Sequence, residues 1–170
     1  ALTQLLTLTN WRDLDYLIVD MPPGTGDIQL TLSQSSPLTG AVVVTTPQDI
    51  ALIDAKKGLK MFEKVNVPLL GIIENMSVFI CPCCGEVTHI FGEGGAKRMS
   101  EQYGVPMLGE LPLSPAIREA ADSGRPTVAA EPESAAAKMY RAIAMKIAGS
   151  IAKLGKDYTA RMPTISVKND

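Results

Sequence analysis

Residues 40–77 read GAVVVTTPQDIALIDAKKGLKMFEKVNVPLLGIIENMS and decide the fold class. Two apolar runs, 40–47 and 67–77, are nearly continuous, as expected for strands buried on both faces of a parallel sheet. The stretch between them, 49–65, carries an apolar helical face formed by Leu52, Ala55, Leu59 and Phe62. The order strand, helix, strand predicts a βαβ unit, so we expect an α/β fold with a doubly wound, mostly parallel sheet flanked by helices.

The rest of the chain extends this pattern. Two more apolar runs, YLIVDM at 16–21 and PMLGELP at 106–112, have the character of buried strands. Helical patterns cover 93–104, 114–124 and roughly 133–154, and the last of these carries an apolar stripe at Met139, Ile143, Ile147, Ile151 and Leu154. We expect one domain over residues 1–155, followed by a polar tail at 156–170.

Composition narrows the class of protein. The chain has 170 residues, a net charge of −2, 46% hydrophobic residues and 20% charged residues. This balance is typical of an ordinary globular domain and gives no reason to expect nucleic acid or a membrane as a partner. No run of 18 apolar residues occurs, and we expect a cytoplasmic protein.

The segment VDMPPGTGD at 19–27 predicts an anion-binding turn at the end of a strand. Asp20 would end the preceding apolar strand, where an unpaired charge is costly unless it meets a cation or hydrogen-bond donors. In nucleoside triphosphatases an acid in this position holds magnesium, and Gly24 and Gly26 would let backbone amides approach a phosphate. Asp27 would cap the next helix or orient a water molecule. The residues alone leave open that Asp20 only caps a turn.

All three cysteines of the chain lie within four positions, at Cys81, Cys83 and Cys84. Cys81 and Cys84 form a C-x-x-C pair, a spacing that lets two thiolates bind one metal centre, whereas Cys83 would point away from it. A zinc or iron–sulfur site usually takes four protein ligands, and no second C-x-x-C occurs in this sequence. Cys81 and Cys84 are therefore half of such a site.

Three solutions to this half site remain open. Two copies of the chain could share one cluster on a twofold axis. Alternatively, the only histidine, His89, could complete a zinc site within one chain, together with Glu86 or Glu93. Finally, the pair could be a redox dithiol without a metal.

Five stretches together closely resemble the Mrp/ApbC family of iron–sulfur cluster carrier ATPases: YLIVDMPPGTGDIQLTL, VVVTTPQDIALIDAKKG, GIIENMSVFICPCCG, FGEGG and LGELPLSPAIREAADSGRPTV. That family belongs to the nucleoside triphosphatases with a deviant Walker A loop, which include MinD and the nitrogenase iron protein. The resemblance covers about residues 1–155 and implies a P-loop NTPase-like fold. The glycine-rich loop of the family is not found here, so we expect the sequence to be the C-terminal part of a longer protein.

The resemblance implies a nucleotide site in the N-terminal part of this sequence. Asp20 matches the acid near magnesium. The switch segment that senses the terminal phosphate of ATP matches Pro22, Pro23, Gly24, Thr25, Gly26 and Asp27.

Later positions match the base, the dimer interface and the cluster. Asn75 matches the amide that reads adenine, and Pro112 begins a loop beside the base. Asp54 matches an acid near a nucleotide-dependent dimer interface. Cys81 and Cys84 match the cysteines that bridge a [4Fe–4S] cluster between two subunits, and Cys83 takes no ligand role.

The function implied is that of a homodimeric scaffold or carrier that binds an iron–sulfur cluster and delivers it to apo iron–sulfur proteins, coupled to ATP and Mg²⁺. Without the glycine-rich loop, we expect these 170 residues to bind ATP weakly or not at all and not to hydrolyse it. The alternatives are a zinc-binding dimerisation module and a partitioning ATPase of the MinD or ParA type.

Overall fold

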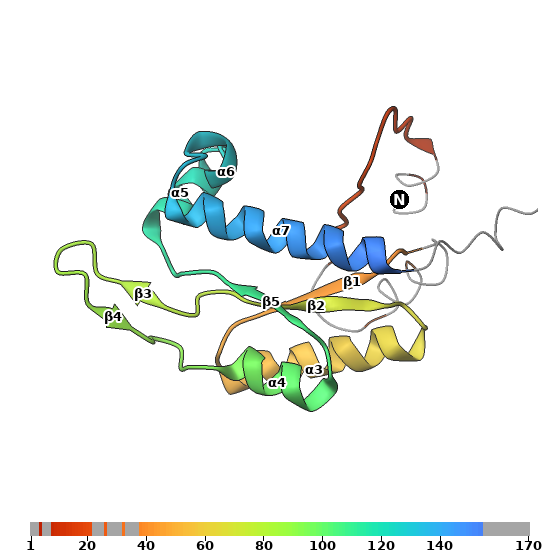
Figure 1. Ribbon diagram of the computed structural model, residues 1–170, viewed down its shortest axis with the longest axis horizontal. Coiled ribbons are helices and arrows are strands. Elements are labelled where there is room, and N and C mark those ends of the chain that lie inside the picture. Colours follow the sequence, from red (N-terminus) through yellow and green to blue (C-terminus); the bar gives the residue numbers. More distant parts are fainter. Residues whose placement is uncertain (1–3, 5–7, 22–25, 27–31, 33–37, 155–170) are drawn as a thin grey trace, which may run out of the picture.

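The computed structural model describes residues 4, 8–21, 26, 32 and 38–154. Its centre is a three-stranded parallel sheet (Figure 1) with the spatial order β1-β2-β5. The strands are β1 (Ala41–Thr45), β2 (Leu69–Glu74) and β5 (Met107–Glu110). The helices are α3 (Asp49–Lys64), α4 (Gly95–Tyr103), α5 (Pro115–Asp122), α6 (Thr127–Ala130) and α7 (Ala135–Lys153). A separate antiparallel hairpin consists of β3 (Phe79–Ile80) and β4 (Val87–Thr88).

Helices cover both faces of the three-stranded sheet, with α3 and α4 on one side and α7 on the other (Figure 1). Neighbouring residues of β2 point to opposite faces, as the period of a strand requires. Ile72 packs in a core cluster with residues of α3 and α4, and Ile73 packs in a second cluster with Ile143 of α7. The predicted doubly wound α/β fold is therefore confirmed.

The local signals in the sequence position most elements correctly. The apolar runs at 40–47, 67–77 and 106–112 contain β1, β2 and β5, and the helical pattern at 49–65 contains α3. Helix α4 ends at Gly104, whose φ of 64° is the left-handed conformation expected there. The stripe on α7 is only partly a core face, because Ile143 is buried whereas Met139 remains 41% exposed.

The strand predicted over 16–21 is wrong. These residues form no strand, and Leu17 and Ile18 are 42% and 82% exposed. An apolar run becomes a buried strand only when another strand offers it hydrogen bonds and cover on both faces. Within the described residues, no strand pairs with the outer edge of β1 or of β5. Residues 16–21 therefore stay outside the sheet, although their hydrophobic pattern resembles that of a buried strand.

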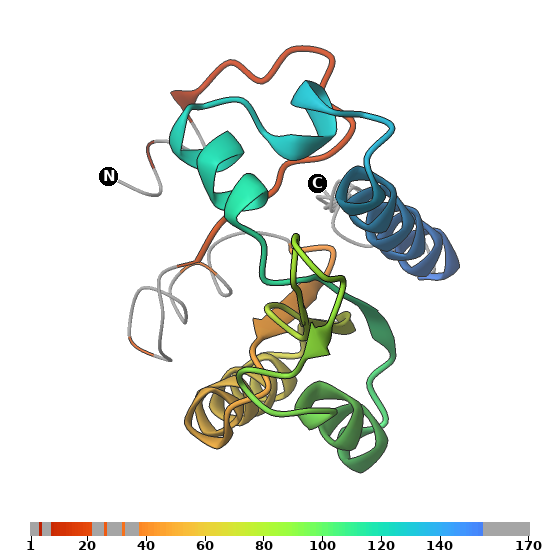
Figure 2. The ribbon, with the colours of Figure 1, turned by 90° about the vertical axis from the view of Figure 1, so that its left-hand side faces the viewer.

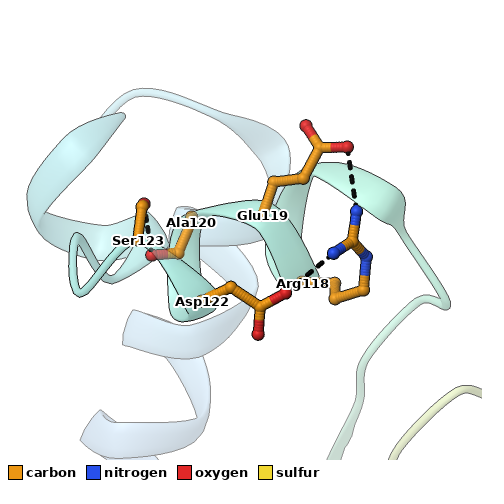
Figure 3. A network of polar contacts seen from close by, with 5 residues as sticks. All are labelled: Arg118, Glu119, Ala120, Asp122 and Ser123. Atoms are coloured by element: carbon orange, nitrogen blue, oxygen red, sulfur yellow. Dashed lines mark hydrogen bonds and ion pairs between the residues drawn. The ribbon is translucent and has the colours of Figure 1, made fainter.

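Helix α5 lies on the surface and makes its polar contacts within itself (Figure 3). Arg118 pairs with Asp122 at 2.7 Å and with Glu119 at 3.1 Å, and the Ser123 hydroxyl donates to the Ala120 carbonyl at 3.0 Å. No residue of α5 is buried, and exposed ion pairs of this kind contribute at most about 1 kcal/mol. The core therefore holds α5 only weakly.

Candidate functional site

The β3–β4 hairpin extends away from α3, α4 and α7 (Figure 1), and Figure 2 views the molecule from the side of this hairpin. The three cysteines lie in the loop that joins its two strands. Register pairs Phe79 with Thr88 and Ile80 with Val87, so the sequence CPCCGE forms the connecting loop. The Cys81 N–H donates to the Glu86 carbonyl at 2.9 Å, and the Gly85 N–H donates to the Cys81 carbonyl at 2.9 Å. Gly85 has a φ of 74°, which glycine adopts without strain, and the chain turns back there.

This tight turn favours the thiolate form of Cys81. Backbone hydrogen bonding from Cys84 and then from Cys83 lowers the pKa of the Cys81 thiol, and the Cys84 thiol adds to the effect. Hydrogen bonds of this kind stabilise the charged form, and the thiolate is the form that ligates metals. All three thiols are free, with Cys81 half-buried and the other two exposed.

The cysteine pair remains half of a site in one copy of the chain. In the part of the chain that the structure describes, no three His, Cys, Asp or Glu side chains gather closely enough to hold a metal ion. The only histidine, His89, lies with its Nδ1 3.0 Å from the Ser77 carbonyl oxygen, and its ring does not gather with two further ligand side chains among the described residues. The structure therefore gives no support to a zinc site completed by His89, Glu86 or Glu93.

A second group of predicted residues meets at the carboxyl ends of the sheet strands, which we call the rim. Asn75, directly after β2, donates its N–H to the Thr45 carbonyl at the end of β1 at 2.7 Å. The Leu111 N–H, directly after β5, donates to the Glu74 carbonyl at 2.9 Å, so Pro112 also lies at this edge. Ligands of open α/β sheets bind outside the carboxyl ends of the strands. The rim therefore places Asn75 and Pro112 where a nucleotide site is expected.

The Asn75 side chain is fixed by the local backbone. Its Oδ1 accepts the Met76 N–H at 2.9 Å, and Met76 has a φ of 54° that few non-glycine residues adopt. The amide nitrogen of Asn75 carries no hydrogen bond to a described residue, so its donors are free to contact a ligand.

Hydrogen bonds join the rim directly to the base of the hairpin. The Ser77 N–H and hydroxyl both donate to the Leu111 carbonyl, at 3.0 and 3.2 Å. The Leu113 N–H donates to the Val78 carbonyl at 2.8 Å, and Leu113 bridges to Phe79. These contacts tie the loop after β5 to the strand that leads into Cys81.

Glu74 is a residue at this edge whose role the sequence does not reveal. It is the last residue of β2, and its side chain is only 2% exposed. Its Oε2 accepts the Ala96 N–H at 2.6 Å, in the first turn of α4, whose N-cap residue Gly94 has no side chain to do so. A carboxylate is well suited to the positive end of a helix. In the sequence, the only sign of this capping role is that an apolar strand pattern ends in an acid.

The other predicted residues that the structure describes take no part in the hydrogen bonds of the rim. Asp20 is exposed, outside any strand, and has no hydrogen bond to a described residue; Gly26 is also exposed. Gly24, Thr25 and Asp27, with both prolines of the switch segment, lie outside the described residues. Asp54 lies on α3, with its side chain 69% exposed, and pairs with Lys57 at 3.0 Å.

Every helix in the described part of the chain is too short or too polar to cross a bilayer.

Comparison with known proteins identifies relatives over most of the chain. Residues 1–148 match the ParA family model described as NUBPL iron-transfer P-loop NTPase. An iron-sulfur cluster carrier protein of Pseudomonas fragi is 59% identical over 145 residues, covering 85% of this chain and 50% of that protein. The carrier protein of Escherichia coli K12 is 60% identical over 151 residues, covering 89% and 41%. The mouse iron-sulfur cluster transfer protein NUBPL is 54% identical over 147 residues, covering 86% and 46%.

The chain is also similar to solved structures of nucleotide-binding proteins. The nucleotide-binding protein of Archaeoglobus fulgidus in complex with ADP is 41% identical, with a TM-score of 0.61 over 72% of this chain and 49% of that one. The cell division ATPase MinD of Pyrococcus furiosus is 30% identical, with a TM-score of 0.52 over 65% and 43%. The chain thus spans about half the length of the curated relatives it matches. With a family model matching residues 1–148 and an α/β fold shared with these solved structures, the chain belongs to the NUBPL iron-transfer P-loop NTPase family.

Proposed function

We propose that the protein carries an iron–sulfur cluster on Cys81 and Cys84 and delivers it to apo iron–sulfur proteins. The cluster is cargo, held by two thiolates from each of two chains in a homodimer. The names of the curated relatives support the carrier role. A [4Fe–4S] cluster fits four thiolates.

The observation that carries this proposal is the geometry of the β3–β4 tip. The turn is closed by the hydrogen bonds of Cys81 with Glu86 and Gly85, and it leaves the cysteine pair accessible at the end of a projecting hairpin. An accessible thiolate pair suits cargo that must be loaded and released, because incoming and outgoing ligands can reach the metal. A purely structural zinc site is normally closed by four ligands of one chain.

ATP and Mg²⁺ couple to the cargo in the whole protein. Asn75 and Pro112 contact the base, Asp54 contacts the dimer interface, and Asp20 holds the magnesium shell. Gly24, Thr25, Gly26 and Asp27 sense the terminal phosphate. The hydrogen bonds between the loop after β5 and the hairpin, such as Leu113 to Val78, support a direct route from the nucleotide to the cluster. The cytoplasm is the proposed compartment, and nucleic acid and membranes are not partners in this proposal.

The test is anaerobic reconstitution with iron and sulfide, followed by analysis of iron, sulfide and zinc per chain and by size-exclusion chromatography. We expect a brown dimer with one cluster per two chains. Cys81→Ala and Cys84→Ala should each abolish the cluster. Cys83→Ala is the matched control, because it removes a neighbouring thiol of the same loop and should retain the cluster.

Two results would contradict the proposal. A colourless dimer with one zinc per two chains would assign the cysteines to a zinc dimerisation module, the second candidate, which the same turn geometry also fits. Cluster transfer from the full-length protein at one rate with ATP, with ADP and without nucleotide would remove the proposed coupling.

A further inference from the structure

The base of the cysteine hairpin carries an uncovered apolar pair. Ile80 and Val87 are register partners across β3 and β4, so their side chains lie on the same face of the hairpin. Ile80 is 52% exposed and Val87 is 58% exposed. Ile80 directly precedes the CPCCGE loop, and Val87 directly follows it. Apolar residues therefore stand next to the ligands, at a place where no helix or strand of the described chain covers them.

The hairpin and the residues that flank it in sequence also carry almost no charged side chains. Between residues 75 and 92, Glu86 is the single Asp, Glu, Lys or Arg, and Ile90 adds a third apolar side chain that is 52% exposed. The cores of protein interfaces are depleted of charged residues in the same way. Near a twofold axis each residue meets its own copy, so apolar side chains attract there and like charges repel.

We propose that the Ile80–Val87 pair is the contact through which a second copy of this chain closes over the shared cluster. This inference rests on the proposed function, because the half site at Cys81 and Cys84 is completed by the same second copy. The hairpins then meet with the apolar pairs beside the cluster. The pairs keep water and chelators from the iron–thiolate bonds and help to hold the dimer together.

The experiment compares the double variant Ile80→Ser/Val87→Ser with the wild-type protein after anaerobic reconstitution. The matched control is Met145→Ser on α7, which removes an apolar side chain that is 72% exposed and far from the cysteines in sequence. The first readout is the dissociation constant of the loaded dimer by analytical ultracentrifugation. The second is the half-life of the cluster absorbance after addition of excess EDTA.

We expect the dissociation constant of the double variant to rise at least about tenfold, because four half-exposed apolar side chains no longer become buried. The cluster half-life should fall by a similar factor, and Met145→Ser should match the wild type in both readouts. The variant Ile80→Leu/Val87→Ile should restore both, which separates the apolar contact from damage to the hairpin.

Distinct results would overturn this inference and the proposed function. An unchanged dissociation constant and half-life in a double variant that still loads the cluster would refute the contact alone. Slower transfer to an apoprotein, with both readouts unchanged, would also refute it and assign the pair to recipient proteins. Failure of the wild type itself to load a cluster would instead refute the proposed function.

Discussion

Replacing Glu74 with alanine tests whether the end of β2 caps α4. The change removes the side-chain partner of the Ala96 N–H, which donates to Glu74 Oε2 at 2.6 Å, and Ala96 has no exposed surface. A buried donor without a partner costs about 1–3 kcal/mol. The lost Cγ methylene of a fully buried side chain adds roughly 0.8 kcal/mol. We therefore expect Glu74→Ala to lower the free energy of unfolding by about 2–4 kcal/mol, measured by urea denaturation followed by circular dichroism.

The adjacent strand offers a matched control. Glu110 is the register partner of Glu74 on β5, but its side chain is exposed and has no hydrogen bond within the described residues. Glu110→Ala should therefore change the free energy of unfolding by less than about 0.5 kcal/mol. Glu74→Gln keeps an oxygen acceptor for Ala96 and should cost clearly less than the alanine variant. If Glu74→Ala were as mild as Glu110→Ala, the capping argument would be refuted.

Three further predictions test packing, the cysteine turn and the proposed interface. Gly109→Ala places a Cβ 2.7 Å from Cγ1 of Ile143, so urea denaturation should show a loss of about 1–3 kcal/mol, whereas Gly58→Ala in open space on α3 should stabilise by up to about 1 kcal/mol. The pH midpoint for alkylation of Cys81, measured by mass spectrometry without metal, should be lower in the native protein than in urea, because the turn stabilises its thiolate; equal midpoints would contradict this. Asp54→Ala should change unfolding by less than about 0.5 kcal/mol, since its ion pair is exposed, so any loss of nucleotide-dependent dimerisation in that variant would reflect the interface.

The periodicity of apolar residues was enough to predict β1, β2 and α3. The runs around β1 and β2 and the apolar face of α3 lie next to one another in the chain, and each pattern is complete by itself. The run at 16–21 has the same hydrophobic pattern, but a strand also needs a pairing edge, which no local pattern supplies. Periodicity alone therefore could not distinguish this run from β2.

In the candidate site too, local spacing predicted some features, whereas contacts between distant parts of the chain determine others. The spacing of Cys81 and Cys84 predicted a ligand pair, and the structure adds the hairpin that presents it. The hydrogen bond of His89 to the Ser77 carbonyl could not be foreseen, because it depends on how the hairpin returns to the rim. Glu74 was missed for a similar reason, since its partner lies 22 residues later in the chain.

The capping of α4 from a distant strand has a consequence for the order of folding. A nine-residue helix is marginal in water by itself, and Gly94 offers α4 no cap of its own. The Glu74 carboxylate reaches Ala96 only after β2 has found its place in the sheet, so α4 is stabilised late. Mutations at this contact should then speed unfolding more than they slow folding, as expected for a contact that forms after the transition state.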